Sequence, residues 1–178
     1  MPERILRWLP ELQNAADKCK VDLHILAAVL DRESLGGEAL WPKGPTGTGD
    51  FGKPGTVHFR DRKKGELGHG RGLMQIDDRA HIGWLELKDA QGTPLWQKPA
   101  DNILKGATIL AQGVAILGCV EGGIAAYNAG PFRAKSVVRS VGWDAPSDKL
   151  IAALDKITTG GDYVSAVLKR AANFKREK

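Results

Sequence analysis

Glu33 is the first residue in the chain whose type and position suggest catalysis. It follows Leu30 by three residues and Leu26 by seven, which places it on the apolar face of a predicted helix over 23–34. Burial and the negative C-terminal end of that helix would both raise the pKa of the carboxyl group. A carboxylic acid that stays protonated near neutral pH can act as a general acid. The alternative is a residue at the edge of the apolar face that extends to solvent or pairs with an arginine.

A second group of candidates surrounds a glycine-rich segment. Residues 65–72 carry a glycine at every second or third position and run into Leu73-Met74-Gln75-Ile76-Asp77. Such a segment can turn sharply or approach a ligand closely, but it lacks the Gly-Lys-Ser/Thr sequence of a phosphate loop. Glu66 and Asp77 place a carboxylate on each side of Gly72, and Gln75 is a polar residue among core-type side chains. We expect Gln75 to have a hydrogen-bonding role.

The third candidate is the Tyr127-Asn128 pair, which lies among small residues between Ala125 and Pro131. This composition suggests a helix end at which a phenol and an amide face a cavity. A buried tyrosine beside an asparagine that caps a helix would explain it equally well.

Other residue types give weaker signals. The four histidines show neither an HExxH pattern nor Cys/His zinc spacing, so we expect no metal and no cofactor. Trp41, within the glycine-rich stretch, is the tryptophan expected to stack on a sugar, and the other four are expected mostly in the core. Cys19 and Cys119 are too few for a disulfide framework, and two free buried thiols are favoured over a bridge.

Hydrophobic spacing predicts helices that would position these side chains. Apolar residues recur at helical spacing over 4–19, and the helix that they predict begins near Pro10. A second predicted helix, over 23–34, is capped by Asp22 and ended by Gly36-Gly37. Later helical patterns, the last of them capped by Asp162, cover 103–117, 124–126, 132–140, 149–157 and 163–174.

The region between Gly36 and Gly72 differs in composition from the rest of the chain. It holds half of the 22 glycines, which excludes a helix and favours a structured loop. Short strands are predicted at 56–59 and, just after this region, at 73–76.

Length and charge limit the class of protein. A chain of 178 residues with 42% hydrophobic and 26% charged residues fits one globular domain and excludes general disorder. The longest apolar run, Ile25–Leu30, is far short of the roughly 18 residues of a membrane span. Charges near the N-terminus predict that there is no signal peptide. The net charge of +5 favours either solubility alone or a polyanionic partner, but no nucleic-acid recognition pattern accompanies it.

The three groups of candidates, followed by Asp162-Tyr163, occur in an order that resembles goose-type lysozymes and the related soluble lytic transglycosylases. Gly72 to His81 resembles the goose-type stretch in which a glycine-rich turn runs into Leu-Met-Gln-Val-Asp, a basic residue and a histidine. Lys105 to Leu110 resembles Gln-Gly-Thr-Thr-Ile-Leu, and Gly122 to Gly130 resembles Gly-Gly-Ile-Ser-Ala-Tyr-Asn-Ala-Gly. The resemblance covers residues 21–175, and four ordered motifs make it specific.

The resemblance implies a role for each matched residue. Glu33 matches the catalytic acid that protonates the glycosidic oxygen, and Asp77 matches an aspartate that holds or activates the attacking water. Glu66 falls where a second such aspartate is expected, with a side chain one methylene longer. The residues that match positions lining the sugar-binding cleft or orienting the acid are Gln75, His81, Tyr127, Asn128 and Tyr163. Gly52 to Lys64 looks like an insertion that could cover the cleft or bind wall polymer through its basic residues.

The implied activity is that of a peptidoglycan hydrolase, or muramidase. It would cleave the β-1,4 bond between N-acetylmuramic acid and N-acetylglucosamine with inversion, Glu33 giving a proton while Asp77, with Glu66, positions water. The alternative is a lytic transglycosylase that leaves 1,6-anhydromuramic acid ends and uses Glu33 as both acid and base, although Asp77 favours hydrolysis. A non-catalytic wall-binding protein on the same fold is the third possibility.

The implied fold is α+β but predominantly α-helical, a lysozyme-like fold with a small irregular β region beside the cleft. We expect one catalytic domain over 1–178, with an N-terminal helix within 1–20, a core over 21–175 and a glycine-rich cleft loop over 41–71. The expected partner is bacterial peptidoglycan, with anionic wall polymers and a proteinaceous lysozyme inhibitor as further candidates. A monomeric, bacteriolytic antimicrobial enzyme that acts outside the cytoplasm and binds no nucleic acid would fit these features.

Overall fold

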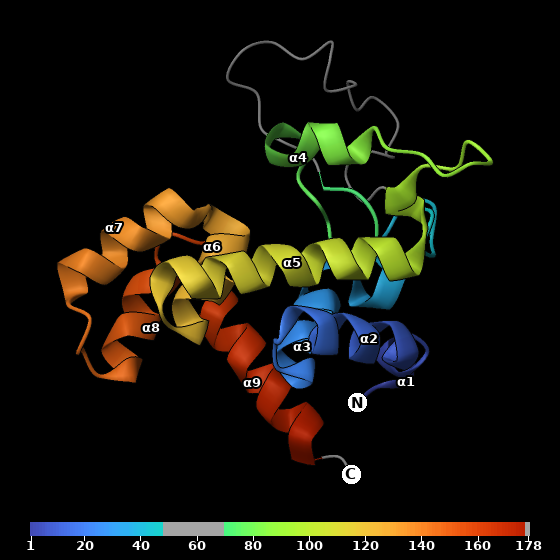
Figure 1. Ribbon diagram of the computed structural model, residues 1–178. Helices are drawn as coiled ribbons and strands as arrows, with labels where there is room; N and C mark the ends of the chain where they lie inside the picture. Colours follow the sequence, from blue (N-terminus) through green and yellow to red (C-terminus); the bar gives the residue numbers. More distant parts are fainter. Residues whose placement is uncertain (48–69, 177–178) are drawn as a thin grey trace. The chain divides into compact units, whose positions relative to one another are not determined.

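The computed structural model describes residues 1–47 and 70–176, most of which are helical (Figure 1). The α-helices of these residues are α1 (Glu3–Leu6), α2 (Leu9–Cys19), α3 (Leu23–Ser34), α4 (Asp78–Leu85), α5 (Pro99–Leu117), α6 (Val120–Ala129), α7 (Pro131–Val141), α8 (Ser147–Asp155) and α9 (Tyr163–Arg176). Short 3-10 turns are η1 (Leu35–Gly37), η4 (Leu95–Gln97) and η5 (Thr159–Gly161). The prediction of a predominantly helical chain is confirmed.

The chain divides into two compact units. The first, called the α6–α9 unit, consists of Met1, Ala16–Val29 and Ala107–Lys178. The second, called the α4 unit, consists of Pro2–Ala15 and Leu30–Gly106. The divisions fall inside α2, α3 and α5, so each of these helices contributes residues to both units.

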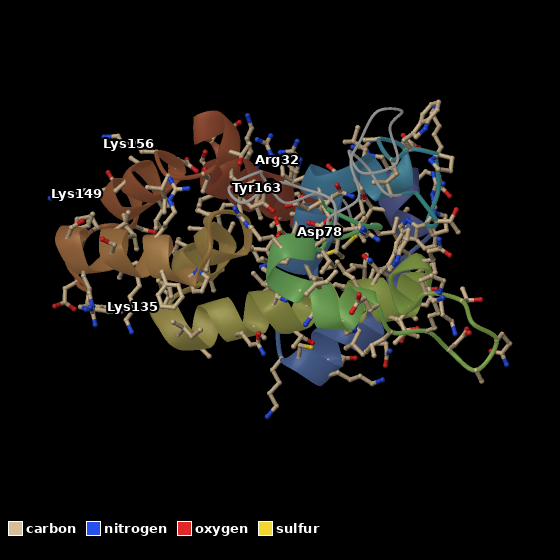
Figure 2. The ribbon with its side chains drawn as sticks, turned by 90° about the horizontal axis from the view of Figure 1, so that it is seen from above. Arg32, Asp78, Lys135, Lys149, Lys156 and Tyr163 are labelled. Atoms are coloured by element: carbon tan, nitrogen blue, oxygen red, sulfur yellow. The ribbon has the colours of Figure 1, made fainter. Side chains whose placement is uncertain are left out.

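In the α6–α9 unit, the four helices for which it is named pack on one another (Figure 1). Apolar side chains such as Ile124, Leu154 and Val167 are fully buried there, as their helical spacing predicts. Lys135, Lys149 and Lys156 project outward from α7 and α8, whereas Tyr163 is buried where α9 begins (Figure 2). The unit therefore has an apolar interior and a basic outer side.

The caps at two helix starts show which carboxylates satisfy exposed backbone amides. At α3 the prediction is confirmed, because Asp22 accepts hydrogen bonds from the amides of His24 at 2.9 Å and Ile25 at 3.0 Å. At α9 the side-chain cap is Asp155 from the end of α8, which accepts from the amide of Val164 at 2.7 Å. Asp162, the cap that the sequence predicts, directly precedes α9, and its capping role stays a prediction.

The predicted strand at 73–76 is wrong, because these residues form a tight turn. Arg71 and Ile76 exchange two backbone hydrogen bonds of 3.1 Å, which close the loop over 72–75. Gly72 and Gln75 have positive φ angles of 70° and 46°, which a strand does not accommodate. Within the described ranges, the one isolated β-bridge pairs Lys88 with Pro94 in antiparallel orientation. The other predicted strand, 56–59, lies outside the described residues.

The tryptophans and cysteines differ in part from expectation. Of the four tryptophans predicted mostly in the core, only Trp96 is buried, whereas Trp8 and Trp84 are half-buried and Trp143 is exposed, so that prediction is wrong for most of them. Cys19 and Cys119 are both free thiols, as predicted, but half-buried rather than fully buried. In the part of the chain that the structure describes, no helix has both the length and the hydropathy to cross a bilayer.

Candidate active site

Glu33 is the last residue but one of α3 and belongs to the α4 unit. Its side chain is half-buried, while every residue from Ile25 to Asp31 is buried. The apolar surface of α3 is therefore wider than the single face that the spacing predicted. The partial burial of Glu33 agrees with a carboxyl group at the border between protein interior and solvent.

Three polar contacts within the α4 unit fix the end of α3. Arg4 of α1 donates to Asp31 at 2.7 Å, and the Asp31 side chain is only 4% exposed. The indole nitrogen of Trp8 donates to the carbonyl oxygen of Gly36 at 2.9 Å. Ser34 accepts from the amide of Gly37 at 3.2 Å. These bonds hold the backbone on both sides of Glu33, and the sequence analysis assigned none of them.

The turn over 71–76 carries Gln75 and leads directly to Asp77. Gln75 is half-buried, and its side-chain Nε2 donates to the carbonyl oxygen of Gly72 at 2.9 Å. Gly72 has no room for a side chain, because a Cβ atom there would lie 2.7 Å from the carbonyl oxygen of Trp96 and closer still to Asn102. The predicted hydrogen-bonding role of Gln75 is thus confirmed within its own turn.

Asn102 of α5 fastens this turn from the inside. Its Oδ1 accepts from the amide of Met74 at 2.8 Å, and its Nδ2 donates to the carbonyl oxygens of Arg71 at 3.1 Å and Trp96 at 2.9 Å. The residue is 1% exposed. Sequence reasoning missed Asn102, although it stands four residues before Gly106 and eight before Leu110, on a buried stripe of α5 where a polar residue is unusual.

Replacing Asn102 with Ala is expected to lower the free energy of unfolding by roughly 2 kcal/mol or more, because the amide of Met74 and the carbonyl of Trp96 would lose this partner at about 1–3 kcal/mol each. The carbonyl of Arg71 would keep its hydrogen bond from the amide of Ile76. Urea denaturation of both proteins measures this. Asn14→Ala, at an exposed position of α2 in the same unit, is the matched control and should leave stability nearly unchanged. Equal stability of Asn102→Ala and the wild type would contradict the assignment.

Arg71 and Asp78 bring opposite charges together beneath the same turn. Both side chains are nearly fully buried, and Arg71 Nη2 lies 3.8 Å from Asp78 Oδ2. The Arg71 guanidinium also lies 5.7 Å from the ring centroid of Trp96. Asp78, labelled in Figure 2, thereby ties the first residue of α4 to the first residue of the turn.

Asp77, the predicted water-positioning residue, is the N-cap of α4. Its Oδ1 accepts from the amides of Arg79 at 2.8 Å and Ala80 at 3.0 Å. Both of these hydrogen bonds go to the same carboxylate oxygen, which fixes the orientation of the group. The residue is half-buried and adjoins the turn that carries Gln75. The structure therefore gives Asp77 a structural role that is compatible with a catalytic one.

His81 lies on α4 near two residues that the sequence analysis did not assign to the site. Its pKa is lowered by burial and by the positive charge of Lys105, while the negative charge of Asp77 opposes the shift. Lys105 of α5 has its Nζ 5.8 Å from the ring centroid of Trp84, which stands three residues after His81 on α4. Burial lowers the pKa of Lys105 as well. Asp77, His81, Trp84 and Lys105 therefore form one electrostatically coupled group in the α4 unit.

The lowered pKa of His81 predicts a pH dependence of stability. Folding disfavours protonation of His81, so this contribution to stability is present above its ordinary pKa of 6.5 and is lost as the pH falls through the lowered value. The difference in unfolding free energy between wild type and His81→Asn should therefore move in favour of the variant as the pH falls from about 7 to 5. Denaturation curves at several pH values measure it, and a pH-independent difference would contradict the interpretation.

The remaining candidates lie in the α6–α9 unit. Asn128, next to the last residue of α6, accepts from the amide of Thr159 at 2.8 Å and so holds the η5 turn. Tyr163 begins α9, is 3% exposed, and its amide donates to Thr158 Oγ1 at 3.4 Å. Tyr127 is half-buried. The side-chain oxygen of Asn128 thus binds the backbone of the segment that leads to Tyr163. The sequence motif did not indicate this contact.

The predicted roles of Glu66 and of the Gly52–Lys64 insertion also fall outside the described residues. Trp41 is 53% exposed, and its role in sugar stacking stays a prediction. Within residues 1–47 and 70–176, no three His, Cys, Asp or Glu side chains come together in a way that could hold a metal ion.

Comparison with known proteins adds a family assignment. Residues 11–149 match the transglycosylase SLT domain. Lysozyme g of Struthio camelus is 29% identical over 174 residues, which cover 96% of this chain and 67% of that protein. Lysozyme g of Casuarius casuarius is 28% identical over 96% of this chain and 74% of that protein, and lysozyme g of Epinephelus coioides is 26% identical over 98% and 78%.

The helical fold and these matches define a lysozyme-like enzyme of the class that acts on peptidoglycan. The chain belongs to the transglycosylase SLT domain family, whose domain matches most of its length. The resemblance inferred from the ordered motifs is thereby confirmed at the level of the family.

Proposed function

We propose that this protein is a muramidase that hydrolyses the β-1,4 bond between N-acetylmuramic acid and N-acetylglucosamine in peptidoglycan. Glu33 would donate a proton to the leaving oxygen, and Asp77 would position and activate the water that attacks from the opposite face, with inversion. The observation that carries the proposal is the fixed carboxylate of Asp77 beside the Gln75 turn, in the same unit as half-buried Glu33. A transglycosylase needs no such second carboxylate.

The other candidate residues would bind and orient the glycan. We assign this role to Gln75, His81, Tyr127, Asn128 and Tyr163, the residues that match the family's sugar-binding positions. Glu66 would assist Asp77. The site requires no cofactor or metal in this mechanism, because proton transfer by carboxyl groups supplies the chemistry. Because peptidoglycan lies outside the cytoplasm, the enzyme would act there. The whole chain would form a single catalytic domain.

The alternative is a lytic transglycosylase, which the name of the matched family favours. In that reaction the 6-hydroxyl group of the muramic acid would replace water, and Glu33 would act first as acid and then as base. Asp77 would then serve only as the cap of α4. The basic outer side of α7 and α8 would suit anionic wall polymers in either case, and a proteinaceous inhibitor of the site would be a further partner.

Digestion of purified peptidoglycan tests whether the protein acts on this substrate at all. We expect the wild type to release soluble glycan fragments from insoluble sacculi, measured as dye released from labelled material. Release that stays at the level of a heat-inactivated sample would contradict the proposed function and would favour the non-catalytic wall-binding protein.

A further inference from the structure

Lys105 is a half-buried cation whose charge no described carboxylate balances through an ion pair. Its side chain emerges from α5, its Nζ lies over the ring of Trp84, and burial lowers the pKa of its ammonium group. Two other cations of the α4 unit pair with carboxylates: Arg4 with Asp31 at 2.7 Å and Lys98 with Asp89 at 2.9 Å. Lys105 has no such ion pair with any residue in the described ranges.

The charges around Lys105 favour a negatively charged ligand from outside the protein. His81 on α4 lies near enough for the charge of Lys105 to lower its pKa. The described charged groups that act on His81 are Lys105 and Asp77, and the carboxylate of Asp77 is occupied at Oδ1 by the α4 amides. A carboxylate placed between Lys105 and His81 would accept hydrogen bonds from both side chains, and Trp84 would form an aromatic wall for the adjoining carbon atoms.

We propose that Lys105, His81 and Trp84 form a subsite that binds a carboxylate substituent of the glycan chain. This inference rests on the proposed function and refines it by naming the part of the substrate that the subsite recognises. N-acetylmuramic acid without a peptide carries such a group in its lactyl ether. Where a stem peptide is attached, an amide bond consumes the lactyl carboxylate, and the carboxylates are those of the peptide. N-acetylglucosamine carries none, so the subsite discriminates between the two sugars.

Binding to three oligosaccharides tests this inference. The ligands are a chitin tetramer, which is neutral; a peptide-free GlcNAc–MurNAc tetrasaccharide with free lactyl carboxylates; and the same tetrasaccharide with stem peptides. Calorimetry would use the Glu33→Gln protein, so that no ligand is cleaved, with and without Lys105→Gln. Lys88→Gln, which removes an exposed lysine of the same unit, is the matched control, and Lys105→Arg keeps the charge.

We expect Lys105→Gln to weaken binding of a carboxylate-bearing ligand about 10- to 100-fold relative to the chitin tetramer, and Lys105→Arg to restore most of it. Loss with the peptide-free ligand identifies the lactyl carboxylate, and loss with the peptide-bearing ligand alone identifies the stem. Equal weakening for all three ligands, or no weakening, would overturn the inference while leaving the proposed function intact. Failure of the parent protein to bind any of the three would overturn both.

Discussion

The Glu33→Gln variant is expected to lose peptidoglycan cleavage by about 10²- to 10⁴-fold while keeping the fold of the wild type. Glutamine has nearly the same shape as glutamic acid but cannot donate a carboxyl proton to the glycosidic oxygen. The contacts that fix the end of α3, Arg4 with Asp31 and Trp8 with Gly36, do not involve the substituted side chain. Because the substitution preserves the shape of the side chain, stability should change little, and the loss should appear in turnover.

The matched control for this variant is Glu38→Gln. Glu38 is an exposed glutamate of the same unit, placed just after η1, and it pairs with Arg7 at 3.2 Å on the surface. Such exposed pairs contribute little to stability, so Glu38→Gln should retain both stability and activity. Rates of fragment release from labelled peptidoglycan compare the two variants. Full activity of Glu33→Gln would exclude Glu33 as the general acid.

The Asp77→Asn variant is expected to separate the two roles that the structure suggests for Asp77. Asparagine is as good an N-cap as aspartate, so its Oδ1 can still accept from the amides of Arg79 and Ala80. An amide cannot take a proton from water, so turnover by a hydrolase should fall about 10²- to 10⁴-fold. Asp77→Ala should lose the cap too, at a cost of about 1 kcal/mol in unfolding free energy.

Thermal unfolding and turnover, measured on the same three proteins, test this expectation. A variant Asp77→Asn that unfolds like the wild type but no longer cleaves would support a catalytic base. Wild-type turnover in Asp77→Asn would leave Asp77 with the cap alone and would favour the transglycosylase.

The sequence predicted the helices better than the contacts that position the candidate site. The bounds of α3 are those that the apolar spacing and Asp22 indicated, because periodicity and capping are local properties of the chain. Residues 73–76 are predicted as a strand from sequence, since their apolar side chains suit either a strand or a buried turn. What makes the segment a turn is the pair of positive φ angles and the three hydrogen bonds of Asn102, which is 28 residues away from Met74.

The candidate residues show the same division between local pattern and tertiary contact. The order of the motifs identified Glu33, Gln75 and Asp77 as candidates, because their residue types and spacing resemble those of goose-type lysozymes. The partners that surround these residues come from elsewhere in the chain: Arg4 of α1 holds Asp31, two residues before Glu33, and Lys105 of α5 lowers the pKa of His81. Long-range partners of this kind leave no periodic signal, and only the folded chain identifies them.

The measurement that tests the central claim most directly is mass spectrometry of the fragments released from peptidoglycan by the wild type, with Glu33→Gln digested in parallel. Hydrolysis with water positioned by Asp77 predicts ordinary reducing ends in the wild-type digest and almost no fragments in the other. Fragments lighter by one water, with anhydro ends, would contradict a hydrolase and show that the protein is a transglycosylase.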